Sequence, residues 1–293
     1  MMLLPIFIGL ILGGMIDDLI PATYVSSFLS RPKKRVLVYS VMLGFLMSAC
    51  SHGMLALAME LNRKGASKAA VISFLLASPW ANLPITILLF GFFGARAFLI
   101  VFSALMIALM TGFIFQQLEK AGWLLPNPQT QVFEESIQIR ADLRRRWRGQ
   151  IWTWGLVSKH LKAIGAGAWS LADMVLPWMY LGLILAAVAA AYVPEHFFHR
   201  FLGPHFLGLL SSLGAATVME VCSEGTAPLA FELYKQTHAF GNVFVFLMAG
   251  VVTDFTEIGL VWKNMGHRSA LAMIFGALPF VVLLGCIFNL FVS

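Results

Sequence analysis

The chain has 293 residues, of which 59% are hydrophobic and only 12% are charged, with a formal net charge of +6 and a mean hydropathy of +0.83. A soluble domain carries roughly 25% charged residues, so this composition excludes an ordinary soluble protein and indicates an integral membrane protein. The basic residues cluster in a few loops, which is typical of membrane topology determinants and not of nucleic-acid binding.

Eight apolar segments follow one another along the chain, and most reach the length of roughly 20 residues that a membrane-spanning helix needs. The first has no basic leader and runs on into Asp17 and Asp18, so we expect a retained helix and not a cleaved signal. The sequence therefore predicts an all-α integral membrane protein, multi-pass in the cell inner (plasma) membrane. The segments lie at about 2–22, 36–62, 69–93, 97–117, 174–193, 206–233, 241–262 and 269–292.

One pattern occurs twice in the chain. CSHG at 50–53 and CSEG at 222–225 are 172 residues apart, and further identities keep this offset. An internal repeat in a very apolar chain is typical of transporters with two-fold pseudosymmetry, whose site lies where the repeats meet. We therefore divide the chain into a first membrane repeat (1–117), a basic linker (118–170) and a second membrane repeat (171–293). The identities include Leu57/Leu229, Glu60/Glu232, Phe74/Phe246, Gly94/Gly266 and Arg96/Arg268.

The linker is polar and ends in an apolar stripe with helical spacing. Two interpretations of this stripe remain open: an amphipathic helix lying on the membrane surface, or a connector helix packed on the bundle. Its many basic residues predict a cytoplasmic location. The stripe consists of Trp154, Val157, Leu161, Ile164 and Ala168.

The distribution of basic residues favours one topology over another. If all eight segments span, the 20 Lys and Arg residues divide 12 to 8 between the two sides. If 36–62 and 206–233 instead enter the membrane and return, only Arg96, Arg200 and Lys235 lie on one side and the other 17 lie opposite. The positive-inside rule prefers the second arrangement. Each repeat then has three spans and one re-entrant hairpin, and the two repeats are inverted.

Glycine and proline residues indicate breaks in these hairpins. Gly53 and Gly225 follow the repeated cysteines by three residues, where a helix can break. Proline is favourable in the first turn of a helix and unfavourable in its middle, so Pro228 indicates a nearby helix start. We therefore expect one helix to end near Cys222 and the next to begin near Thr226.

The next segment of each repeat is also interrupted. The stretch 78–84, SPWANLP, brings Pro79 and Asn82 into a span, and its partner is 250–257, GVVTDFTE. Breaks in corresponding segments of two halves point to a transport site. Between hairpin and span, Gly65 is expected to end one helix and Ser67 to cap the next.

Cys50 and Cys222 are the first candidates for function. At a hairpin break, the following half-helix presents free N–H groups and a positive dipole end, which favours a thiolate. Thiolates bind soft metals, trivalent metalloids and sulfur species. The alternative is that each cysteine is a small apolar packing residue, which is the interpretation we adopt for the unpaired Cys286.

His52 and Glu224 occupy the same position in the two copies. With Cys50 and Cys222 they form a candidate cluster of two thiolates, an imidazole and a carboxylate, which can hold a soft divalent metal ion or relay protons. The alternative is that each side chain caps its own hairpin. A soft metal ion would be a substrate, and the sequence indicates no resident cofactor.

Acidic residues inside apolar segments form a third group. Asp254 corresponds to Asn82 of the first copy, and Glu257 follows it by three residues on the same helix face. Intramembrane acids are functional candidates, here for proton or cation coupling. The alternative is a structural role with Lys263, Arg268 or a backbone break. For Glu60 and Glu232 we expect ion pairs with Arg63, Lys64 and Lys235, which follow them at helical spacing.

Two stretches carry a resemblance to a known family. KGASKAAVISFLLASPWANLP (64–84), preceded by ACSHG (49–53), and MEVCSEGTAPLAFEL (219–233), followed by FLMAGVVTDFTEIG (246–259), resemble the ArsP/YraQ-like predicted permeases. The resemblance implies a multi-pass inner-membrane permease, and some members export trivalent organoarsenicals. His52 and Glu224 stand where the arsenical-type pattern has a second cysteine. The residues that the resemblance implicates are Cys50, Cys222, Pro79, Asn82, Asp254 and Glu257.

The sequence therefore predicts a permease for a small soft or thiol-reactive solute: an organoarsenical, a soft metal ion or a sulfur compound. Its expected partners are membrane lipid and that solute, with a second copy or an accessory subunit as candidates and no nucleic acid. HExxH, GxSxG, GxxxxGK[ST] and CxxC are absent from the sequence, so we expect no enzyme. The alternatives are a membrane thiol-redox or metal-dependent enzyme, and a non-transporting subunit that docks a partner.

Overall fold

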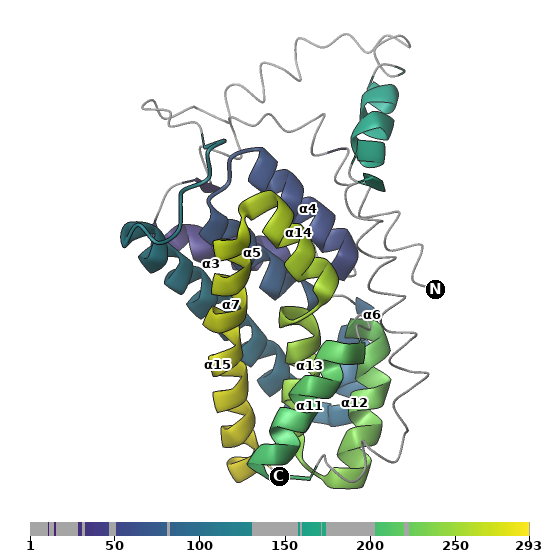
Figure 1. Ribbon diagram of the computed structural model, residues 1–293. Coiled ribbons are helices and arrows are strands. Elements are labelled where there is room, and N and C mark those ends of the chain that lie inside the picture. The colour runs from purple at the N-terminus through teal and green to yellow at the C-terminus, as the bar shows by residue number, and fades with distance from the viewer. Residues whose placement is uncertain are drawn as a thin grey trace.

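The described part of the chain is helical (Figure 1). The structure, a computed structural model, describes residues 11, 15, 29–30, 33–46, 51–80, 83–130, 158, 160–170, 172–173, 203–219 and 223–292. The predicted apolar segments 2–22 and 174–193 fall almost entirely outside these ranges. Within them no strand occurs, as expected for an all-α protein.

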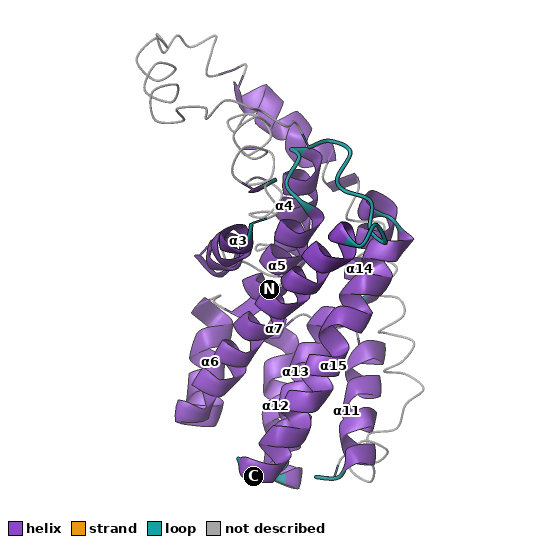
Figure 2. Ribbon diagram, turned by 90° about the vertical axis from the view of Figure 1, so that its left-hand side faces the viewer, coloured by secondary structure: helices purple, strands orange, loops and turns teal. Residues whose placement is uncertain are grey.

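Within the described residues, each half of the chain contributes five principal helices, which Figure 2 shows packed together. In the first half, a short 3-10 helix η1 (Ser78–Trp80) follows the third of them and another, η2 (Gly94–Arg96), precedes the fifth. The first half contains α3 (Lys34–Leu46), α4 (Ser51–Arg63), α5 (Lys68–Ala77), α6 (Leu83–Phe93) and α7 (Ala97–Lys120). The second contains α11 (Phe206–Met219), α12 (Ser223–Thr237), α13 (Phe240–Val252), α14 (Phe255–Met265) and α15 (His267–Phe291).

The helix boundaries repeat with the same offset as the sequence. Shifted by 172 residues, the starts of α3, α4, α5 and α6 at 34, 51, 68 and 83 become 206, 223, 240 and 255, which are the starts of α11 to α14. The start of α7 at 97 becomes 269, two residues inside α15. The internal sequence repeat is therefore also a repeat of helices.

Helix packing repeats as well, both within and between the halves. Helix α5 packs on α3, α4 and α7, and α13 packs on α11, α12 and α15. Between the halves, α4 contacts α14 while α12 contacts α6. Both views place α4 and α14 toward one end of the molecule and α6 and α12 toward the other (Figures 1 and 2). Such reciprocal contacts are what a two-fold axis between similar units produces.

One pair of contacts shows this reciprocity at single residues. Lys68 Nζ, at the start of α5, donates a hydrogen bond of 2.8 Å to the carbonyl oxygen of Met265, at the end of α14. Their counterparts at the offset of 172 are Phe240 and Phe93, whose ring centroids lie 6.1 Å apart. The same two positions therefore touch at both ends of the molecule, through a polar contact at one end and an aromatic contact at the other.

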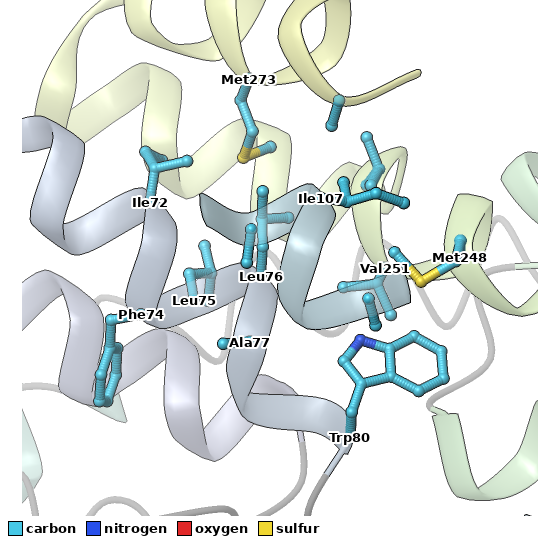
Figure 3. Close-up of a cluster of buried hydrophobic side chains, with 14 of the residues drawn as sticks. Ile72, Phe74, Leu75, Leu76, Ala77, Trp80, Ile107, Met248, Val251 and Met273 are labelled. Carbon is cyan, nitrogen blue, oxygen red and sulfur yellow. The ribbon is translucent and has the colours of Figure 1, made fainter. Parts of the chain in front are cut away.

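The core is centred on α5. All ten of its residues are buried, because α3, α4 and α7 surround it. Figure 3 shows Leu76 of α5 near Ile107 of α7, with Met273 of α15 beyond it. The outer helices α3, α7, α11 and α15 instead expose large apolar side chains, among them Met42, Phe102, Leu207 and Phe275. A burial pattern of this kind suits a lipid surrounding and not water.

Three helical segments are long and apolar enough to cross a membrane, judged by length and composition within the described residues. They are Leu88–Lys120, Phe240–Met265 and His267–Phe291. The second runs through the junction of α13 and α14, and most of it is buried inside the protein. The structure thus contains membrane-span candidates, fewer than the eight apolar segments of the sequence.

The turn between α4 and α5 has the predicted chemistry. Gly65 has a φ of +90°, a conformation that favours glycine, and the N–H of Ala66 returns to the carbonyl of Leu61 at 3.0 Å. The hydroxyl of Ser67 then accepts the N–H of Ala70 at 3.3 Å and caps α5. Both expectations for this turn are confirmed.

The first residues of the linker lie over this turn. After α7 ends at Lys120, Asn127 Nδ2 donates to the carbonyls of Asn62 and Ala66 at 2.7 and 2.8 Å. Thr130 Oγ1 donates to the carbonyl of Gly65 at 3.1 Å. The predicted amphipathic stripe falls partly on described residues: 160–170 are helical, with Leu161 of the stripe exposed and Ile164 and Ala168 half-buried.

Glycines allow α13 and α15 to approach closely. A Cβ added at Gly241 would collide with the backbone carbonyl oxygen of Gly285 and with the side chain of Asn289. The N–H of Gly241 also donates to Asn289 Oδ1 at 2.8 Å. By contrast, a Cβ at Gly214 of α11 would meet nothing within 4 Å.

We therefore predict that Gly241→Ala destabilises the protein by about 1–3 kcal/mol, the usual effect of overpacking a tight contact. Gly214→Ala should leave stability unchanged or raise it slightly, because alanine favours a helix interior over glycine. Thermal unfolding in detergent, followed by fluorescence-detected size exclusion, measures both. Equal stability of the two variants would contradict the close approach.

Candidate functional site

The repeated cysteine of each predicted hairpin lies between two described helices, in a stretch outside the described residues, so the helix break expected there stays a prediction. Helix α3 ends at Leu46 and α4 begins at Ser51, while α11 ends at Met219 and α12 begins at Ser223. Cys50 and Cys222 directly precede α4 and α12, but both lie outside the described residues, so the surroundings of their thiols stay predictions. His52 and Glu224 lie in the first turns of these helices with undescribed side chains. Among the described residues no three His, Cys, Asp or Glu side chains form a group for a metal ion.

The second hairpin differs from the prediction in where its helix begins. Helix α12 starts at Ser223 and not near Thr226, so Gly225 belongs to its first turn and Pro228 lies inside the helix. Gly53 likewise belongs to the first turn of α4 and is buried. Because proline has no N–H, Pro228 leaves the carbonyl four residues earlier, at 224, without its helical hydrogen bond.

Both predicted span interruptions are present in the helix boundaries. Between α5 and α6, Pro79 lies in the buried 3-10 turn η1, and Ser78 Oγ donates to the carbonyl of Leu75 at 2.9 Å. Between α13 and α14, the helix stops at Val252 and resumes at Phe255. Asn82 falls in the first interruption, outside the described residues. The two central segments are thus broken at corresponding positions.

Asp254 forms the start of α14. Its Oδ1 accepts the backbone N–H of Thr256 at 2.7 Å and that of Glu257 at 3.2 Å, and the residue is 4% exposed. This is the geometry of an N-cap, which satisfies amide groups that have no partner within the helix. One of the structural roles considered for this acid, support of a backbone break, is therefore present.

Glu257 is buried without a comparable partner. It is 1% exposed, and neither of its carboxyl oxygens has a hydrogen-bond partner among the described residues. Two cations were considered as its structural partners: Lys263 makes no hydrogen bond with it, and Arg268 instead donates to the carbonyl of Trp123 at 3.2 Å. A buried polar atom without a partner is rare in native structures and is often found at functional sites.

Threonines line the break in α13–α14 on the side of the second hairpin. Thr217 Oγ1 of α11 and Thr253 Oγ1 lie 2.8 Å apart, within hydrogen-bonding distance. The methyl group of Thr226 in α12 lies 4.0 Å from the position of a Cβ at Gly250 in α13. The two helices that flank Cys222 in sequence therefore both contact α13 within four residues of Asp254.

Sequence reasoning missed Trp80, in the interruption of the first half. The residue is fully buried, and its indole N–H has no hydrogen-bond partner among the described residues. Figure 3 shows its ring beneath Val251 and beside Met248 of α13, just ahead of the Asp254 break. The sequence does contain a signal for this residue, because a tryptophan beside Pro79 places a hydrogen-bond donor in an apolar span.

The repeated glutamates outside the breaks form the predicted ion pairs. Glu60, buried in α4, lies 3.4 Å from Arg63 Nη1 and 3.8 Å from Lys64 Nζ. Its counterpart Glu232 lies 3.2 Å from Lys235 Nζ in an exposed position. These carboxylates have partners that explain them, which separates them from Glu257.

Interrupted central helices with buried polar groups are the pattern of a membrane transporter, and sequence comparison agrees. Residues 1–290 match the ArsP_1 family, described as "Predicted permease". The chain belongs to this family. The match covers both halves and the linker, and the family description supports membrane transport as the general function.

Two curated relatives are similar over most of this chain. "Putative permease Rv2963" of Mycobacterium tuberculosis is 27% identical over 268 residues, which cover 85% of this chain and 64% of the relative. The chain thus spans less than two thirds of that protein's length. "UPF0718 protein YcgR" of Bacillus subtilis is 23% identical over 273 residues, covering 92% of this chain and 86% of the relative. No solved structure matches.

The cap at Asp254 generates a prediction about stability. Asp254→Ala removes the acceptor for two amide groups and should lower the free energy of unfolding by about 0.5–2 kcal/mol. Asp254→Asn keeps an acceptor oxygen and should retain stability. Thermal unfolding in detergent measures both variants, and an equal loss in the two would mean that the charge, and not the acceptor, stabilises the break.

Proposed function

We propose that the chain is a secondary permease of two inverted repeats, with its solute site where the two interrupted spans and the two cysteine-bearing hairpins meet. The observation that carries the proposal is the matched interruption of α5–α6 and α13–α14. Broken helices in corresponding segments of two halves supply the ends and unpaired backbone groups that bind solutes at mid-membrane.

Inversion of the repeats is supported by packing and by charge. The contacts α4–α14 and α12–α6 lie toward opposite ends of the molecule (Figure 1), as an axis within the membrane plane would require. The basic residues of the sequence favour the same arrangement, since re-entrant hairpins collect 17 of 20 Lys and Arg residues on one side. The positive-inside rule makes that side, with the linker, cytoplasmic.

The proposed solute is small and soft or thiol-reactive: an organoarsenical, a soft metal ion or a sulfur compound. Support comes from Cys50 and Cys222, each directly before the start of a helix. A helix N-terminus favours the thiolate, which is the form that binds soft ions and metalloids. His52 and Glu224 in the following turns would complete the set of ligands, with Asn82 and Asp254 at the adjoining breaks.

Two other functions use the same residues differently. A membrane thiol-redox or metal-dependent enzyme would turn over thiols or retain a metal through purification. A non-transporting subunit would bind a partner and move no solute. Flux of a solute into sealed vesicles containing only this protein separates the permease from both.

We predict that Cys50→Ser and Cys222→Ser each abolish transport of the solute that wild type moves, because serine removes the soft ligand and keeps the size. Cys286→Ser is the matched control: Cys286 lies half-buried in α15, far along the chain from the breaks, and should retain transport. The measurement is uptake and efflux of trivalent arsenicals, soft metal ions and thiosulfate, with membrane levels of each variant equalised.

Transport that survives both substitutions would remove the thiols from the site. The proposal of a soft solute would then fail, while transport through the interrupted spans would stand.

A further inference from the structure

The carboxyl group of Glu257, which has no hydrogen-bond partner among the described residues, suggests what drives transport. This inference rests on the proposed function. This residue lies in the first turn of α14, immediately after the break in a membrane-span candidate. Its side chain is enclosed by protein, with 1% of the residue exposed. A carboxylate in such a place has lost its water without gaining a hydrogen bond or a cation from any described residue.

The backbone N–H groups at the start of α14 already have a hydrogen-bond acceptor. Asp254 Oδ1 accepts the N–H groups of both Thr256 and Glu257, so the amides that would stabilise a negative charge are used by the neighbouring acid. Two carboxyl groups thus share one helix N-terminus, and only one of them is satisfied. Two like charges so close together are costly to ionise at the same time.

The helices that pack most extensively against α14 bring no opposite charge to Glu257 from any described side chain. They are α4, α13 and α15. Helix α13 contains no ionisable residue. In α15 the cations are at the very start, where Arg268 donates to the carbonyl of Trp123. In α4, Glu60 and Arg63 pair with each other, and the side chain of His52 is not described.

We propose that Glu257 is the proton-carrying group of this permease and that solute movement is coupled to H⁺. In the state seen here, a carboxyl oxygen holds a proton taken from water. When the break in α13–α14 opens to water, the O–H bond breaks, the proton leaves to that water, and the resulting carboxylate is solvated. The charge of Glu257 thereby differs between open and closed states, which is what couples a proton gradient to the conformational change.

The first test detects the protonated carboxyl group of Glu257 and needs no transported solute. Infrared spectra of the purified full-length protein in lipid, at neutral pH, are compared for wild type, Glu257→Gln and Glu232→Gln. Glu232 is the matched control, an exposed glutamate that pairs with Lys235. We expect the carbonyl band of a protonated carboxylic acid in wild type and in Glu232→Gln, and its loss in Glu257→Gln. Identical bands in all three proteins would overturn the proposal.

The second test reads coupling in proteoliposomes with phenylarsine oxide as the probe. An imposed pH gradient should drive net accumulation by wild type and by Glu232→Gln. Glu257→Gln should lose this accumulation, because a neutral amide releases no proton, and should retain exchange of labelled for unlabelled probe. Glu257→Asp restores a carboxyl group and should recover part of the pH response, which separates a chemical loss from misfolding.

The outcomes distinguish the two proposals. Flux by wild type that ignores the pH gradient overturns the coupling and leaves the permease standing. Loss of both the accumulation and the infrared band in Glu257→Gln supports both proposals. If wild type moves neither phenylarsine oxide nor the other probes, the proposed function fails, and the infrared comparison alone decides whether Glu257 holds a proton.

Discussion

The arrangement of the buried, interrupted helices is constrained by the free-energy cost of an unpaired backbone group in a membrane. Lipid offers no hydrogen bonds, so a helix can be interrupted at membrane depth only where protein surrounds the break. The interrupted segments α5–η1 and α13–α14 are accordingly the buried ones, whereas the continuous helices α7 and α15 lie outside with exposed apolar faces. At the α13–α14 break the backbone is repaired by Asp254 and Thr253, whose hydroxyl also meets Thr217.

The two halves share a backbone plan but have diverged in side chains, and the residues at the breaks are among those that differ. Where the first half has Trp80, with an unpartnered N–H, the second has Val252; where the first has Asn82, the second has Asp254. Helix α4 is buried throughout its middle, while its counterpart α12 is half open: Leu57 is 0% exposed and Leu229 is 43% exposed. Repetition therefore supplies the scaffold, and the side chains at the breaks differ between the two copies.

Much of this plan could be predicted from sequence. The offset of 172 residues predicted the equivalence of α3–α6 with α11–α14, because glycines, caps and apolar runs fix helix boundaries locally. The start of α12 at Ser223 was not predicted: Pro228 suggested a later start, and a proline in the second turn is tolerated here because only one carbonyl loses its donor. The isolation of Glu257 could not be predicted either, since it depends on where Arg268 and the cap of Asp254 place their hydrogen bonds.

The two ends of the molecule are joined by different chemistry at equivalent positions, and this bears on how such a protein moves. At one end Lys68 donates a hydrogen bond to the carbonyl of Met265, which joins α5 to α14. Arg268 donates to the carbonyl of Trp123, which joins α15 to the linker. At the other end the equivalent contact is Phe93 against Phe240, extended by Phe231 and Tyr234. A hydrogen bond is present at this end too, because Arg96, the counterpart of Arg268, donates to the hydroxyl of Tyr234. Hydrogen bonds are directional and weaken steeply when donor and acceptor move out of line. Aromatic side chains, by contrast, can shift against one another while they remain buried. Separation of the halves therefore costs different free energies at the two ends, so two-fold pseudosymmetry of the backbone does not make the two open states equal.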